Sequence, residues 1–133
     1  MTRYMLDTNI ISDLLKNPRS KAAKRLADVG NEDICTSIIV AAELRYGAVK
    51  NGSKHLLQLV EGILREIKVL SFDAPADSEY GAIRSELERA GKIIGANDLL
   101  IAAHARAAAA TVVTANVGEF KRIRGLKVEN WLA

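Results

Sequence analysis

Acidic and amide side chains follow two apolar runs of strand length. Asp7 ends the run YMLD, and Asn116 and Glu119 come shortly after TVVT. In an open α/β sheet, ligands bind just outside the carboxyl ends of the strands, so these groups are candidate ligands. Each also has a plainer interpretation. Asp7 or Thr8 can cap the next helix, and Asn116 is good material for a turn.

Two more acids lie in apolar helical stretches. Glu43 lies in SIIVAAELRYGA, and Asp98 lies near the start of ANDLLIAAHA. The residues three and four positions from Glu43 are mostly apolar, so this side chain lies on or borders the buried face of its helix. The alternatives are an exposed Glu43 and a helix that is capped by Asn97 or Asp98.

Convergence of these acids would require a counter-charge. Two carboxylates about 4 Å apart repel by roughly 4 kcal/mol at an effective dielectric constant of 20. Oxygen-only ligand sets suit Mg²⁺ or Mn²⁺, and such ions activate water and act on phosphoryl oxygens. A shared site would therefore predict a divalent cation and phosphoryl chemistry.

Several other chemistries fit the sequence less well. A single cysteine, Cys35, excludes a four-cysteine zinc site and an internal disulfide. The two histidines are far apart, and the sequence contains no G-x-S-x-G, Walker A or G-x-G-x-x-G motif. His104 follows Asp98 by six residues and projects in a different direction, so we interpret it as a packing or surface histidine.

Positive charge is concentrated late in the chain. The net charge is +3, and the segment KRIRGLK contains Lys121, Arg122 and Arg124. Such a cluster is either a solvated surface or a patch that follows a phosphate backbone.

Alternating strand and helix patterns must position these side chains. The predicted strands are 3–6, 33–36, 69–72, 111–114 and 127–129. The predicted helices are 10–16, 19–29, 37–50, 53–67, 75–90 and 97–110, the last apolar on nearly all sides. This alternation predicts an α/β fold whose parallel sheet is covered on both faces.

Length and composition predict one soluble domain that comprises residues 1–133. The chain is 49% apolar and 26% charged and has only two prolines. No secretory signal is evident, and the longest apolar stretch is too short to span a membrane. We therefore expect a cytoplasmic protein with no membrane association and a buried Cys35 thiol.

Four motifs in this order resemble the PIN-domain toxins of the VapC family over essentially the whole chain. They are YMLDTNIISDLL, SIIVAAELRYGA, IGANDLLIAAHA and TVVTANVGEFKRIRGLKVENW. The likeness is greatest to the subgroup described as cleaving initiator tRNA.

The resemblance implies a three-layer α/β/α sandwich, a homodimer and a Mg²⁺- or Mn²⁺-dependent endoribonuclease of a type II toxin–antitoxin system. It also implies a VapB-like antitoxin, whose C-terminal tail covers the site and whose N-terminal region contacts operator DNA. The acidic site of the family corresponds here to Asp7, Glu43, Asp98 and, more variably, Glu119.

The resulting hypothesis gives each residue a role. Asp7 and Asp98 bind the metal ion, and Glu43 bridges to it through water or acts as the base. Glu119 and Asn116 complete the ligand shell of the metal ion, and Thr8 or Thr114 positions water or phosphate. The RNA backbone is positioned by the basic residues Lys121, Arg122 and Arg124. The RNA substrate is expected to be tRNA.

Two alternatives remain at this point. A receiver-like signalling domain would place Asp7 and Asp73 together at a Mg²⁺ site. A catalytically inactive PIN scaffold would only bind its antitoxin, although the presence of Asp7, Glu43 and Asp98 argues against it.

Overall fold

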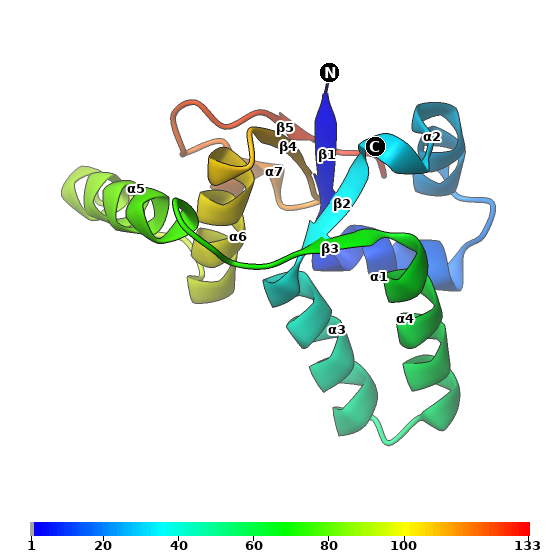
Figure 1. The fold of residues 1–133 in the computed structure, drawn as a ribbon. Coiled ribbons are helices and arrows are strands. Elements are labelled where there is room, and N and C mark those ends of the chain that lie inside the picture. The colour runs from blue at the N-terminus through cyan, green and yellow to red at the C-terminus, as the bar shows by residue number, and fades with distance from the viewer. Residues whose placement is uncertain (1) are drawn as a thin grey trace.

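The computed structural model describes residues 2–133 and contains a five-stranded parallel sheet with helices on both faces (Figure 1). The strand order is β3-β2-β1-β4-β5. The strands are β1 (Arg3–Leu6), β2 (Ile34–Ser37), β3 (Lys68–Leu70), β4 (Ala110–Val113) and β5 (Val128–Glu129). The helices are α1 (Thr8–Lys16), α2 (Lys21–Val29), the 3₁₀ turn η1 (Asn31–Asp33), α3 (Ile38–Lys50), α4 (Lys54–Glu66), α5 (Ala76–Ala90), α6 (Ala96–Ala107) and α7 (Val117–Phe120). The predicted α/β/α sandwich is confirmed.

The order in which the chain passes through the strands explains which helices cover each face of the sheet. The connections that run from β1 to β2 and on to β3 place α1 to α4 on one face of the sheet. The connection from β3 back across the sheet to β4 places α5 and α6 on the opposite face (Figure 1). The central strand β1 therefore lies between β2 and β4, and its carboxyl end opens between the two helical layers.

Side-chain caps begin several of the helices. Asp7 caps α1, Ser20 caps α2, Ser37 caps α3 and Ser53 caps α4, each by accepting a backbone N–H. Asp7 directly follows β1 and Ser37 is the last residue of β2, so each strand leads directly into its helix.

The amino-terminal end of α6 differs from the prediction. The helix is preceded by Gly95, which has no capping side chain, so neither Asn97 nor Asp98 is the cap. Both side chains lie within the first turn and point to other partners. The expected burial of this helix is confirmed, since Leu99 and all residues from 101 to 105 are buried.

The carboxyl-terminal end of α6 also differs. The prediction of a helix over 97–110 was too long, because α6 ends at Ala107 and β4 begins at Ala110. Ala109 makes the turn with φ of 54°, a left-handed conformation that glycine usually supplies. The alanine run therefore contained no local signal for the end of the helix.

Other boundaries differ by one or two residues. Strand β2 covers 34–37 rather than 33–36, and β3 covers 68–70 rather than 69–72. Cys35 is buried, as predicted. Within residues 2–133, no helix combines the length and the apolar character needed to cross a bilayer.

Candidate active site

The predicted acids meet at the carboxyl end of the sheet. Asp7, Glu43, Asp98 and Asn116 line a single cavity of ≈ 590 Å³. They come from the end of β1, from α3, from the first turn of α6 and from the loop after β4. Glu119 does not line the cavity but contacts Asn116.

Asp7 is held by the two elements between which it lies. Its Oδ1 accepts the backbone N–H of Thr8 at 2.8 Å, and its Oδ2 accepts the hydroxyl of Thr114 at 2.8 Å. The β1–β4 register pairs Leu6 with Val113, which brings the residues after them together. Only 3% of Asp7 is exposed, and burial raises the pKa of its carboxyl despite these hydrogen bonds, with a further contribution from the Glu43 charge. Asp7 is therefore both the predicted cap and a member of the acidic cavity.

Glu43 is oriented by two neutral donors. Thr8 Oγ1 donates to its Oε1 at 2.7 Å, and Asn97 Nδ2 donates to its Oε2 at 3.1 Å. Glu43 is partly buried, so it borders the buried face of α3 as predicted. Thr8 links Asp7 to Glu43, because its backbone bonds to one acid and its side chain to the other.

Asp98 and Glu119 form a pair bridged by an amide. Asn116 Nδ2 donates to Asp98 Oδ2 and to Glu119 Oε2, both at 2.9 Å. Burial raises the pKa of Asp98 to about 7, and a hydrogen bond to Glu119 and the Asp7 charge act in the same direction. That hydrogen bond lowers the pKa of Glu119. The two carboxyl groups therefore titrate as a pair, and the raised pKa favours one shared proton near neutral pH.

Sequence reasoning missed several residues of this cavity. Helix α1 contributes the half-buried Ser12 and Asp13 and the exposed Lys16, and Leu132 contributes from the segment after β5. Asn9 Oδ1 accepts the backbone N–H of Ala115 at 3.1 Å and so holds the loop that carries Asn116. The spacing of Asn9, Ser12 and Lys16 along one helix face could have indicated a shared surface.

The donor set fits a hydrated divalent cation. Carboxylate and amide oxygens are the ligands that Mg²⁺ and Mn²⁺ prefer, and Asp13 Oδ2 is buried beside them without a hydrogen-bond partner. Among residues 2–133, no three His, Cys, Asp or Glu side chains lie close enough to enclose one ion. Mg²⁺ often uses only one or two carboxylates and keeps several waters, so the cavity suits such an ion without forming a closed cage.

The predicted basic residues are exposed and line a second cavity. Arg122 and Arg124 line a space of ≈ 550 Å³ together with Arg89 and Lys92 from the end of α5, and Lys121 does not line it. The Arg122 guanidinium helps to lower the pKa of Glu119, so this basic surface adjoins the acidic site.

The receiver-type alternative fails on topology. It requires Asp7 and Asp73 at one site, but Asp73 lines a different cavity, beside His104. Strand β3, which precedes Asp73, lies at the edge of the sheet and is separated from β1 by β2.

Comparisons with known proteins agree with this arrangement. The family model of the PIN domain matches residues 4–126. Ribonuclease VapC2 of Rickettsia felis is 45% identical over 130 residues, which are 96% of this chain and 97% of that protein. The tRNA(fMet)-specific endonuclease VapC of Shigella flexneri is 39% identical over 132 residues, or 98% of this chain and 99% of that one.

Solved structures extend the likeness to three dimensions. The crystal structure of VapBC2 from Rickettsia felis bound to a promoter DNA fragment contains a chain with a TM-score of 0.89 and 41% identity, and the match covers 98% of this chain and 99% of that one. The family match and these full-length relatives lead to one conclusion: the chain belongs to the PIN-domain family and, within it, to the VapC group.

Proposed function

We propose that this chain is a divalent-metal-dependent endoribonuclease, the toxin of a type II toxin–antitoxin pair, and that its substrate is tRNA, with initiator tRNA the first candidate. The observation that carries the proposal is the convergence of Asp7, Glu43 and Asp98 on one cavity. The names of the relatives support it, because one is a ribonuclease and another a tRNA(fMet)-specific endonuclease.

Asp7 and Asp98 would hold the cation, with Glu43 reaching it through water. A bound Mg²⁺ or Mn²⁺ supplies a water of lowered pKa and positive charge beside the scissile phosphate. Thr8 and Thr114 keep Asp7 in one orientation, so its remaining lone pairs are available to the cavity. Cation binding would displace the proton shared by Asp98 and Glu119, because a ligating carboxylate must be ionised.

Glu43 is the proposed base. Both of its oxygens already accept hydrogen bonds from neutral donors, which fix the carboxylate without neutralising it. From that position it accepts a proton from the attacking water, which bonds to phosphorus as a ribose oxygen leaves and takes up a proton from solvent. Asn116 and Glu119 support this arrangement by holding Asp98 in place.

The basic surface would bind the RNA backbone. Arg122 and Arg124, with Arg89 and Lys92, offer positive charge beside the acidic cavity, and Lys121 extends it along the exposed surface. Such contacts position a substrate without reading its sequence.

The proposed assembly follows the solved relatives. These include a VapBC complex bound to promoter DNA, so we expect a VapB-like antitoxin, with operator DNA contacted through that antitoxin. We also expect residues 1–133 to act as a single PIN domain in a homodimer and to be located in the cytoplasm.

The test is cleavage of purified tRNA by the full chain. We expect cleavage with Mn²⁺ or Mg²⁺, none with EDTA, and loss of activity in Asp7→Asn. The matched control is Asp28→Asn, which neutralises an exposed aspartate on α2. Sequencing of the new RNA ends identifies the tRNA and the cleaved bond.

Two results would contradict the proposal. Cleavage that persists in EDTA or in Asp7→Asn would mean that the acidic cavity is not the catalytic site. No RNA cleavage by the wild-type chain with either metal, together with tight antitoxin binding, would favour the inactive scaffold.

A further inference from the structure

The chain turns back across the molecule after the edge strand β5. Trp131 is 5% exposed and packs on Tyr4 of β1, with ring centroids 5.3 Å apart. The Asn130 side chain accepts the backbone N–H of Leu132 at 2.9 Å, which closes the turn between them. Leu132 is therefore the neighbour of a buried aromatic anchor.

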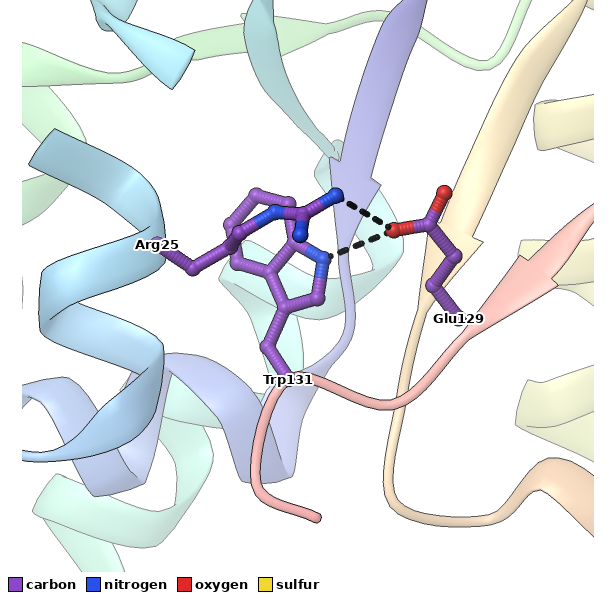
Figure 2. A network of polar contacts seen from close by, with 3 residues as sticks. All are labelled: Arg25, Glu129 and Trp131. Atoms are coloured by element: carbon purple, nitrogen blue, oxygen red, sulfur yellow. Dashed lines mark hydrogen bonds and ion pairs between the residues drawn. The ribbon is translucent and has the colours of Figure 1, made fainter. Parts of the chain in front are cut away.

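Two side chains, Glu129 and Arg25, hold Trp131 in one orientation (Figure 2). Glu129 Oε1 accepts the indole N–H of Trp131 at 3.0 Å and an N–H of Arg25 at 3.3 Å. The Arg25 guanidinium also lies over the indole, 5.7 Å from its ring centroid. We call Arg25, Glu129 and Trp131 the tail clamp. It joins α2 to the segment after β5, so it fixes a segment that β5 alone, with two residues, would hold weakly.

The clamp places Leu132 in the wall of the acidic cavity. Among the described residues that line this cavity, Leu132 alone has an aliphatic side chain; the others are charged, hydroxyl or amide residues. An apolar group on such a surface gains nothing from water or a cation. It gains from an apolar surface of a ligand, such as the face of a ribose or a nucleobase.

We propose that Leu132 contacts a nucleoside of the RNA beside the scissile phosphate, and that the tail clamp positions it. This inference rests on the proposed ribonuclease function and adds a substrate-contacting residue outside the acidic set. Arg25, Glu129 and Trp131 are positioning residues, because they act through Leu132.

The first experiment compares Leu132→Ser with wild type in steady-state cleavage of initiator tRNA. Loss of the apolar contact should raise KM about tenfold, while kcat stays within about twofold. Leu132→Met, which keeps an apolar side chain of similar volume, should restore KM to near the wild-type value. The increase in Tm produced by Mn²⁺ should be the same in all three proteins.

The second experiment tests positioning. Glu129→Gln keeps an acceptor for the indole N–H but removes the charge that pairs with Arg25. It should raise KM by about threefold in the wild-type background and have no effect in Leu132→Ser, since Glu129 acts through Leu132. A purely structural role for Glu129 would lower Tm and leave KM unchanged in both backgrounds.

A third measurement separates this inference from the proposed function. In an Asp98→Asn background, which blocks cleavage, tRNA affinity is measured with Leu132 and with Leu132→Ser. Weaker binding of the serine variant supports the contact even if the wild-type chain cleaves no RNA. Equal affinity and equal KM with Leu132 and Leu132→Ser, or a methionine variant as weak as the serine one, would overturn it and leave the acidic site untouched.

Discussion

Helix α6 contributes to two buried polar clusters of opposite character. At its amino-terminal end, Asp98 joins an acidic cavity in which burial and, to a smaller extent, neighbouring carboxylates raise the pKa of Asp98 and of Asp7. Further along, His104 lies 2.7 Å from the Ser37 hydroxyl, hydrogen-bonds to the backbone of Ser71 and packs edge-on against Phe72. His104 is 3% exposed, and burial lowers its pKa, so the ring is neutral.

The difference separates a structural cluster from a functional one. Around His104, the Ser37 hydroxyl and the backbone of Ser71 satisfy the ring, and the nearby Asp73 carboxylate attracts a proton rather than repelling a like charge, so the folded chain needs nothing further. Around Asp98, like charges face one another and are relieved only by a proton or a cation. Burial and a shifted pKa are therefore not sufficient to identify a functional site. The sign of the neighbouring charges distinguishes a functional cluster from a structural one.

The largest expected effect is on catalysis. Asp98→Asn should lower tRNA cleavage by about 10²–10³-fold or more, because it removes a charged ligand from the site. His104→Gln should leave kcat/KM within about threefold of wild type, since His104 lines a different cavity. Steady-state rates with Mn²⁺ measure both. Equal losses in the two variants would mean that the two clusters act as one site.

Substitutions in the two clusters should affect stability in the opposite order, with the larger loss in the His104 cluster. His104→Ala should destabilise the protein by roughly 2–4 kcal/mol, because it leaves a cavity and removes the hydrogen bond between the ring and the Ser37 hydroxyl. Asp98→Asn in EDTA at about pH 8 should stabilise it by about 1–2 kcal/mol, a rise in Tm of roughly 3–8 °C, since repulsion is relieved. The same variant should lose the increase in Tm that Mn²⁺ produces. An Asp98→Asn protein that melts like wild type in EDTA and still responds normally to Mn²⁺ is incompatible with a shared acidic site.

The pH dependence of Tm in EDTA should differ in sign between the clusters. The pKa of Asp98 is raised from 3.8 to about 7 in the folded chain, so the stability that its proton supplies is fully present below 3.8 and is lost as the pH rises from there through about 7. The pKa of His104 is lowered from 6.5, so its contribution is complete above that value and is lost as the pH falls below it. Asp98→Asn should remove a fall in Tm between about pH 5 and about pH 7, and His104→Gln should remove a rise in Tm over the part of this range below 6.5. Melting curves between about pH 5 and pH 8 test this, and the reverse assignment would refute both pKa shifts.

The smallest effect is expected from the removal of exposed positive charges. Replacing Lys121, Arg122 and Arg124 with alanine should weaken tRNA binding and reduce the slope of log affinity against log salt by about 2, because fewer counterions are released. The Mn²⁺-induced increase in Tm should persist, since these residues lie outside the acidic cavity.

The matched control removes the same number of positive charges from a different part of the surface. Alanine at Lys54, Arg65 and Lys68 also removes three exposed positive charges, from α4 and β3. It should leave the salt slope unchanged. Equal slopes in the two triple variants would mean that the cluster at 121–124 is only a solvated surface.

Much of the acidic site could be predicted because its signals are local. A carboxylate at the end of an apolar strand, as at Asp7, or on the border of a buried helix face, as at Glu43, is unusual enough to be noticed in one sequence. Parallel strands end at one edge of a sheet, so convergence followed from the fold class.

The remainder depends on tertiary packing. Arg89 and Lys92 join the basic cavity only because α5 ends beside the segment after α7, and nothing in their local sequence indicates this. Leu132 looks like an ordinary apolar residue until the tail clamp places it in the cavity. The end of α6 was missed because Ala109 adopts a conformation that its own type disfavours.

The hydrogen bond between Thr114 and Asp7 joins residues 107 positions apart and has a consequence for synthesis. During translation, β1 and its acid leave the ribosome long before β4 exists, so Asp7 at first has neither its neighbouring strand nor its hydroxyl partner. Closing so long a loop is slow relative to local helix formation. The nascent chain therefore cannot assemble the cavity until most of its length has emerged, and a protein that cuts RNA is held inactive beside the ribosome by the order of its own strands.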